Sequence, residues 1–211
     1  MKKLVCSFGF VGLFISCSEP ADETAAEPID TTTQVVVPEI VEPEIINSFV
    51  LESGTVGLFK IGAPMPKLPT EISSRKATAT LTEDGKKVDH VMYVISNSLE
   101  DIAEVIMVND TTIAEEDLTI QEVVVISNYY ETSNNVKIGT TLTTFAEKHP
   151  DTKVWYNGAT GELVAETSAY PEIQFILDPD SSSKKPKGTK NINLSLSSFN
   201  EDTKIKTIKV L

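Results

Sequence analysis

Two apolar runs joined by a short turn strongly limit how this chain can fold. Residues 76–82 alternate alanine or leucine on one side with threonine on the other, and residues 88–95 form a second apolar run. Asp84-Gly85 lies between them, and a two-residue hairpin turn needs positive φ at both central residues, which this pair tolerates. The alternation around such a turn predicts a β-hairpin within an antiparallel sheet.

Short apolar runs bounded by turn residues continue along the chain. Residues 102–108 and 120–126 are apolar on both faces, which is typical of central strands. Asn157-Gly158 separates two further apolar pairs and indicates a second hairpin. Additional strands are predicted at residues 173–177 and 205–211.

One stretch, about residues 140–149, has the pattern of a helix. Leu142, Phe145 and Ala146 share one helical side, a threonine hydroxyl precedes them as a cap, and Pro150 follows the pattern. One principal helix packed on a mainly antiparallel β-sheet predicts an α+β fold.

A short phrase occurs twice in the sequence. Residues 59–62 read Phe-Lys-Ile-Gly, residues 136–139 read Val-Lys-Ile-Gly, and spaced apolar residues follow each. We interpret this as a degenerate strand–glycine–helix duplication, in which three prolines oppose a regular helix after the first copy. The phrase resembles one in small bacterial envelope lipoprotein domains, such as the outer-membrane assembly lipoproteins and the β-lactamase-inhibitor fold. It covers about a dozen residues, so the resemblance concerns architecture alone.

The start of the chain has the features of a secretory signal. It opens Met-Lys-Lys, residues 4–15 are largely apolar but too short to span a bilayer permanently, and Ser16 precedes Cys17. Residues 14–17 read Phe-Ile-Ser-Cys and resemble the lipobox of bacterial lipoproteins, with phenylalanine in place of the common leucine.

This resemblance implies that residues 1–16 are a type II signal peptide and that Cys17 is lipidated, with palmitate among the acyl groups. Two or three chains anchor stably, because each buried methylene contributes about 0.8 kcal/mol. Ser18 implies the outer membrane, and the acidic residues after it resemble export tracts of Bacteroidota surface lipoproteins. We expect a lipid anchor in the outer membrane, on the periplasmic face or the cell surface. The alternative is an ordinary signal peptide with an incidental cysteine.

Residues 17–45 differ in composition from the rest of the chain. After the cysteine they contain eight acidic residues and four prolines, with no basic, glycine or aromatic residue. Such a segment buries too little apolar surface to offset its ordering entropy, which predicts a disordered acidic tether. The alternative is that residues 34–45 form an edge strand. Residues 46–211 are predicted to form a single globular domain.

Composition excludes several function classes. A net charge of −13 argues against nucleic-acid binding, because such proteins neutralise phosphates with basic side chains. Two histidines and two cysteines leave little material for a metal site, and no glycine-rich loop joins a strand to a helix as nucleotide binding requires. We therefore predict no cofactor, no metal site and no catalytic residues, with His90 and His149 in structural roles.

Two candidate contact surfaces remain. One is aromatic and the other is a basic cluster in a polar stretch, and aromatic rings or clustered charges often mark binding surfaces. The candidate residues are Tyr129, Tyr130, Trp155, Tyr156, Lys184, Lys185, Lys187 and Lys190. For each, the more usual interpretation is structural: one ring of each pair lies in the core, and the lysines belong to a solvated loop.

These features together predict a membrane-anchored envelope lipoprotein whose domain is non-catalytic and binds an envelope protein or a glycan. One alternative is a carboxylate-dependent hydrolase of surface polysaccharide, for which the densest acidic group is Glu115, Glu116 and Asp117. Another alternative is an inhibitor or immunity-type lipoprotein that blocks a hostile enzyme.

Overall fold

The computed structural model describes residues 49–211, except for residues 84, 182–185 and 187. The predicted signal peptide, Cys17, the acidic tether and the alternative edge strand at residues 34–45 all lie outside the described residues. So do Lys184, Lys185 and Lys187 of the predicted basic cluster.

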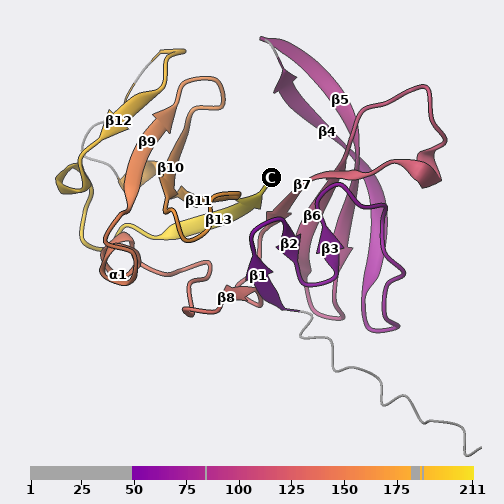
Figure 1. Cartoon of the computed structure of the whole chain (residues 1–211), viewed down its shortest axis with the longest axis horizontal. Coiled ribbons are helices and arrows are strands. Elements are labelled where there is room, and N and C mark those ends of the chain that lie inside the picture. The colour runs from indigo at the N-terminus through magenta and orange to yellow at the C-terminus, as the bar shows by residue number, and fades with distance from the viewer. Residues whose placement is uncertain (1–48, 84, 182–185, 187) are drawn as a thin grey trace, which may run out of the picture. The chain divides into compact units, whose positions relative to one another are not determined.

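A nine-stranded sheet dominates the described part of the chain (Figure 1). Its first half is an antiparallel meander in which successive strands lie side by side. These strands are β4 (Ser73–Glu83), β5 (Lys86–Ser96), β6 (Asp101–Met107) and β7 (Ile120–Val125). Both β6 and β7 lie inside the sheet, as their continuous apolar character predicts.

The second half has the order β12-β9-β10-β11, also antiparallel. Its strands are β9 (Lys153–Asn157), β10 (Glu162–Glu166), β11 (Ile173–Leu177) and β12 (Ile192–Leu194). The last strand, β13 (Ile205–Val210), lies between β11 and β7 and joins the two halves. The C-terminal strand is therefore internal to the sheet.

A four-stranded sheet of short strands has the order β3-β2-β1-β8. The strands are β1 (Val50–Glu52), β2 (Thr55–Val56), β3 (Phe59–Lys60) and β8 (Glu131–Thr132). Neighbours are antiparallel except β1 and β8, which run parallel. Backbone bonds from Gly62 to Ile120 and from Ile120 to Ala63 tie the segment after β3 to β7.

The single α-helix of the described residues is α1 (Leu142–Lys148), and three 3-10 turns accompany it, η1 (Glu115–Asp117), η2 (Pro179–Ser181) and η3 (Leu196–Ser198). The Thr141 hydroxyl caps α1 by accepting from the Thr144 amide at 3.1 Å. Phe145 is fully buried, and its ring centroid lies 4.7 Å from that of Phe175 in β11. The helix therefore packs its predicted apolar side on the sheet.

The predicted α+β class, with mainly antiparallel strands and one principal helix, is confirmed. The hairpin around residues 84–85 is also confirmed, since Glu83 pairs with Lys86 and Gly85 has a φ of 76°. The hairpin at Asn157 forms as well, with a longer loop in which Gly161, at φ 78°, supplies the positive dihedral.

The predicted strand–glycine–helix duplication is found only in fragments. Residues 59–60 form β3, but no helix follows them, as the prolines there predict. Residues 136–139 lead into α1 but are not a strand. Both segments are fully described, and what they share is a glycine at positive φ, 77° for Gly62 and 90° for Gly139.

Candidate functional site

The four predicted aromatic residues lie on two separate elements. Tyr129 and Tyr130 precede β8, and their ring centroids lie 5.8 and 5.5 Å from that of Phe49. Tyr130 is buried, which raises its pKa to about 12, whereas Tyr129 is 39% exposed. Trp155 and Tyr156 belong to β9 of the large sheet and are half-buried. Among the described ring contacts, none joins the two pairs.

Lys190 is the one predicted basic contact residue that the structure describes, and it is exposed. Its segment packs against the β9–β10 hairpin, where the Asn191 side chain accepts a 3.0 Å bond from the Gly158 amide. A Cβ atom on Gly158 would overlap the backbone of Thr189 and Lys190. Gly158 is therefore needed for close approach of the two segments.

The acidic group that the hydrolase alternative would use is exposed. Glu115, Glu116 and Asp117 form η1, which contains no buried residue. Glu115 forms an ion pair with Lys76 and accepts a 3.0 Å bond from the Tyr93 hydroxyl. The Lys76 bond and then the Tyr93 bond hold the pKa of Glu115 below its usual range. A general acid needs the opposite shift, so Glu115 is poorly suited to that role.

Both histidines are buried and packed into the domain. His90 Nδ1 lies 3.1 Å from the Met107 carbonyl, and its Nε2 lies 3.0 Å from Glu83 Oε1 but out of line for a hydrogen bond. His149 packs among rings, with centroids 5.1 Å from Phe145 and 5.5 Å from Tyr170. Burial lowers the pKa of His149, which favours a neutral imidazole.

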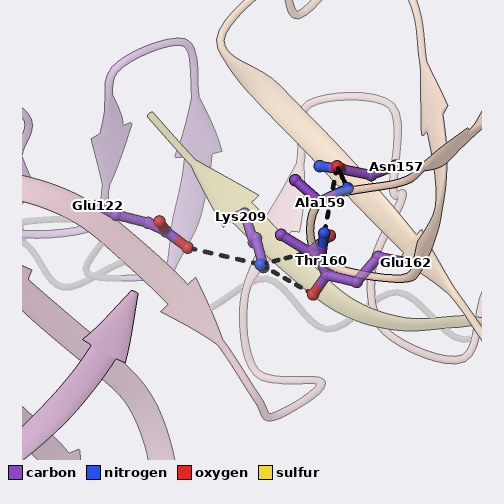
Figure 2. Close-up of polar contacts among 6 residues, drawn as sticks. All are labelled: Glu122, Asn157, Ala159, Thr160, Glu162 and Lys209. Atoms are coloured by element: carbon purple, nitrogen blue, oxygen red, sulfur yellow. Dashed lines mark hydrogen bonds and ion pairs between the residues drawn. The ribbon is translucent and has the colours of Figure 1, made fainter. Parts of the chain in front are cut away.

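A partly buried ion-pair cluster that we did not predict joins β7, β10 and β13. Lys209 in β13 places its Nζ 2.8 Å from Glu162 Oε1 in β10 and 3.9 Å from Glu122 Oε1 in β7 (Figure 2). The Thr160 hydroxyl donates to Glu162 at 2.8 Å, and Asn157 accepts from the Thr160 amide at 3.3 Å. The cluster links strands from both halves of the sheet.

Opposing effects act on Glu122 in this cluster. Burial raises its pKa, Lys209 opposes that shift, and Glu162 adds to it. A carboxyl with a raised pKa beside a second carboxylate is a general-acid candidate on electrostatic grounds. Here, however, the lysine lies between the two carboxylates, hydrogen-bonded to Glu162 and in ion-pair contact with Glu122, which is typical of a structural ion-pair network.

Asp151 lines a cavity of about 390 Å³, together with Lys153, Glu166 and residues 167–168. Its carboxylate accepts bonds from the Ser168 hydroxyl, the Ser168 amide at 2.7 Å and the Thr167 hydroxyl at 2.8 Å. These bonds, that from the Ser168 side chain first, hold the pKa of Asp151 well below its usual range. The carboxylate therefore stays ionised and fixes the loop between β10 and β11.

The largest of the described cavities is a groove of about 530 Å³ between α1 and η3, which we call the α1–η3 groove. Exposed carboxylates line it beside an apolar surface. Its apolar lining residues are Leu142, Ala146, Leu196 and Phe199, and its acidic ones are Glu147 and Glu201. Leu196 is 42% exposed, so the groove offers apolar surface of the kind that lines ligand sites.

Local sequence fixes both walls of the α1–η3 groove. The start of α1 is bound to the chain entering β13, because the Leu142 amide donates to the Thr203 carbonyl at 2.7 Å. On the other wall, the Ser195 hydroxyl caps η3 by accepting from the Ser197 amide at 3.3 Å. The groove is therefore largely preformed, as ligand sites in proteins usually are.

The described residues contain no cluster of three or more metal-ligating side chains. None of their helices is long and apolar enough to cross a membrane. Of the concave sites, the α1–η3 groove is suited to binding, since it offers apolar contact area beside fixed negative charge. Sequence reasoning missed it because Leu196 lies in a polar stretch far along the chain from α1.

No protein-family model matches the chain, and comparison with curated proteins found no match. Among solved structures, the crystal structure of the uncharacterized protein yfeY from Escherichia coli aligns with 77% of this chain and 98% of its own. The TM-score is 0.48 and the sequence identity is 12%.

Proposed function

We propose that this protein is a membrane-anchored envelope lipoprotein whose β-rich domain is a non-catalytic binding module. Support for the anchor comes from the sequence, in which Phe14-Ile15-Ser16-Cys17 resembles a lipobox and an acidic tether follows. Two or more acyl chains on Cys17 would hold the chain in the outer membrane. The tether would then let the domain search for its ligand at a distance from the bilayer.

The α1–η3 groove is the observation that carries the binding role. Its apolar floor includes a leucine that is 42% exposed, and a ligand that covers it gains part of the about 1.5–3 kcal/mol that full burial of a leucine contributes. Glu147 and Glu201 beside that floor favour cationic groups, and the net charge of −13 acts in the same direction. We therefore infer that the ligand is an extended protein segment in which apolar side chains alternate with Lys or Arg.

A defined peptide tests this role. A fluorescent hexapeptide of alternating lysine and leucine should raise its anisotropy on binding the purified full-length chain in detergent, with chain-free detergent as the blank. Leu196→Lys should weaken binding about tenfold, because it removes apolar contact area and places a positive charge beside the lysines of the peptide. Ile192→Lys is the matched control, since Ile192 is 40% exposed and lies in β12 outside the groove.

Two outcomes would contradict the proposed ligand. If an alternating glutamate–leucine peptide binds as tightly, the acidic lining of the groove plays no part in selection. If Leu196→Lys and Ile192→Lys bind the lysine–leucine peptide equally, the α1–η3 groove is not the binding site.

The anchor is tested separately from the groove. Radiolabelled palmitate should enter the native chain in growing cells and should not enter a Cys17→Ser variant. That variant should also keep residues 1–16 and leave the outer-membrane fraction. Equal labelling or identical fractionation of the two chains would contradict lipidation at Cys17.

A further inference from the structure

The outer edge of β4 is long and regular. It ends the nine-stranded order, and its eleven residues pair with β5 from Ser73 to Glu83 without a register shift. The opposite edge strand, β12, has three residues, and three other pairings in this sheet contain shifts. Proteins usually shorten, bulge or cover edge strands, because unpaired backbone N–H and C=O groups recruit other strands. Among the described residues, no strand pairs with this edge.

The part of the β4–β5 hairpin next to its turn extends beyond the strands that pair with β5. Strand β6 pairs with β5 only from Met92 onward, so residues 78–83 and 86–91 form a two-stranded ribbon beyond β6 (Figure 1). Two-stranded ribbons are at best marginally stable in water. Another strand along β4 would give this ribbon a third member and would pair its free backbone groups.

We propose that β4 pairs antiparallel with β4 of a second copy of this chain, with Ala79 opposite the partner's Ala79. The two nine-stranded sheets then form one continuous sheet across a two-fold axis. Strand β4 is basic at its start, with Arg75 and Lys76, and acidic at its end, with Glu83. An antiparallel pair brings opposite charges together at both ends, whereas a parallel pair would oppose like charges.

Side-chain chemistry selects this register. Arg75 lies opposite the partner's Glu83, and the reciprocal pair forms at the other end. Between these ends Thr78 lies opposite the partner's Thr80, and Ala77 lies opposite the partner's Leu81. Opposite charges, threonine pairs and apolar pairs all stabilise neighbouring strands. A shift by two residues leaves Glu83 without a basic partner, and a shift by one residue reverses the faces.

The charged residues at the two ends are accessible for these pairs. The Arg75 side chain is 63% exposed and that of Glu83 is 43% exposed. Arg75 already binds Asp101 through one nitrogen at 2.7 Å, and a guanidinium carries five N–H donors. It can therefore contact Asp101 and the partner's Glu83 together.

Cysteine cross-linking of the full-length chain tests both the partner and the register. Ala79→Cys should form a disulfide-linked dimer when isolated envelopes are oxidised, because directly opposed Cβ atoms lie about 4.5–5.5 Å apart. Thr82→Cys is the control: Thr82 is exposed on the same strand, but its two copies would lie about 20 Å apart. The native chain, with Cys6 and Cys17 alone, gives the background.

Charge reversal tests the end pairs in the Ala79→Cys background. Arg75→Glu or Glu83→Arg should each reduce cross-linking about tenfold, because two attractive pairs per dimer become repulsive. The double reversal should restore it.

The proposal is overturned if Ala79→Cys gives no dimer above background, if Thr82→Cys cross-links equally, or if the adduct contains another protein. It is also overturned if the double reversal fails to restore cross-linking through Ala79→Cys. None of these results depends on the α1–η3 groove.

Discussion

Lys209 shows how one side chain connects distant parts of this molecule. It lies in the last strand, yet its partners Glu122 and Glu162 come from β7 and β10 (Figure 2). A charged residue within an apolar strand was a visible signal in the sequence, because Ile208 and Val210 flank Lys209 and valines follow Glu122. The pairing itself was not predictable, since it depends on which strands become neighbours.

Replacing Lys209 with methionine should destabilise the domain by about 2–3 kcal/mol at pH 7, because Glu122 would stay buried without its counter-charge. Glu122 has a raised pKa in the folded state, so its ionisation costs stability as pH rises above its ordinary value of 4.5. Without Lys209 that pKa rises further, and the deficit should shrink as pH falls from 7 toward 4.5. Urea unfolding at both pH values measures this.

The control for this prediction is the double variant Lys209→Met with Glu122→Gln. Removing the carboxylate charge should recover most of the lost free energy of unfolding at pH 7. A Lys209→Met deficit that is independent of pH, or that the second substitution does not reduce, would contradict the account of the ion pair.

Asp151→Asn should lower the thermal midpoint at pH 7, because the three donors from residues 167–168 would lose their charged acceptor. The folded-state pKa of Asp151 is depressed, so its stabilisation is present above the ordinary value of 3.8 and is lost as pH falls. The difference between the thermal midpoints of the two chains should therefore be smaller at pH 3 than at pH 7. Asp117→Asn, in the exposed η1, should change neither midpoint. A difference as large at pH 3 as at pH 7 would contradict this origin.

At the scale of elements, prediction succeeded where the determinants are local. Asp84-Gly85 specified a turn, and the spacing of Leu142, Phe145 and Ala146 specified α1. It failed for residues 136–139, whose apolar residues suggested a strand. There the backbone bonds to the chain entering β13, with the Gly139 amide donating to the Ile205 carbonyl at 2.8 Å. A tertiary contact thus overrode local propensity.

The cap of α1 gives an element-scale prediction. Thr141→Ala should lower the free energy of unfolding by about 1 kcal/mol, because the Thr144 amide would lose its hydroxyl acceptor. Thr143→Ala is the control, since Thr143 is exposed within the helix and alanine has the higher helix propensity. Chemical denaturation of both variants measures the difference. Equal stabilities would contradict capping by Thr141.

At the scale of the whole domain, the order of strands could not be read from the sequence. A sequence pattern indicates that residues 205–211 form a strand, but it does not indicate that this strand lies between β7 and β11. That position is fixed by packing of Ile208, which pairs with Val125 on one side and Phe175 on the other and is fully buried. Contacts between residues so distant in the chain leave no local periodicity to detect.

This position of β13 predicts that the two halves of the sheet unfold as one unit. Ile208→Ala should cost about 2–5 kcal/mol, because it opens a cavity where both halves meet. Trp155, in β9, reports on one half, and hydrogen exchange of amides in β6 and β7 reports on the other. Both probes should report the same unfolding transition in denaturant, because loss of β13 leaves β11 and β7 each without a neighbouring strand on that side. Leu211→Ala should leave both transitions unchanged, because the side chain of Leu211 is 42% exposed and the substitution keeps the 2.9 Å bond from its amide to the Glu172 carbonyl. Separate transitions for the two halves would mean that β13 belongs to one half and merely contacts the other.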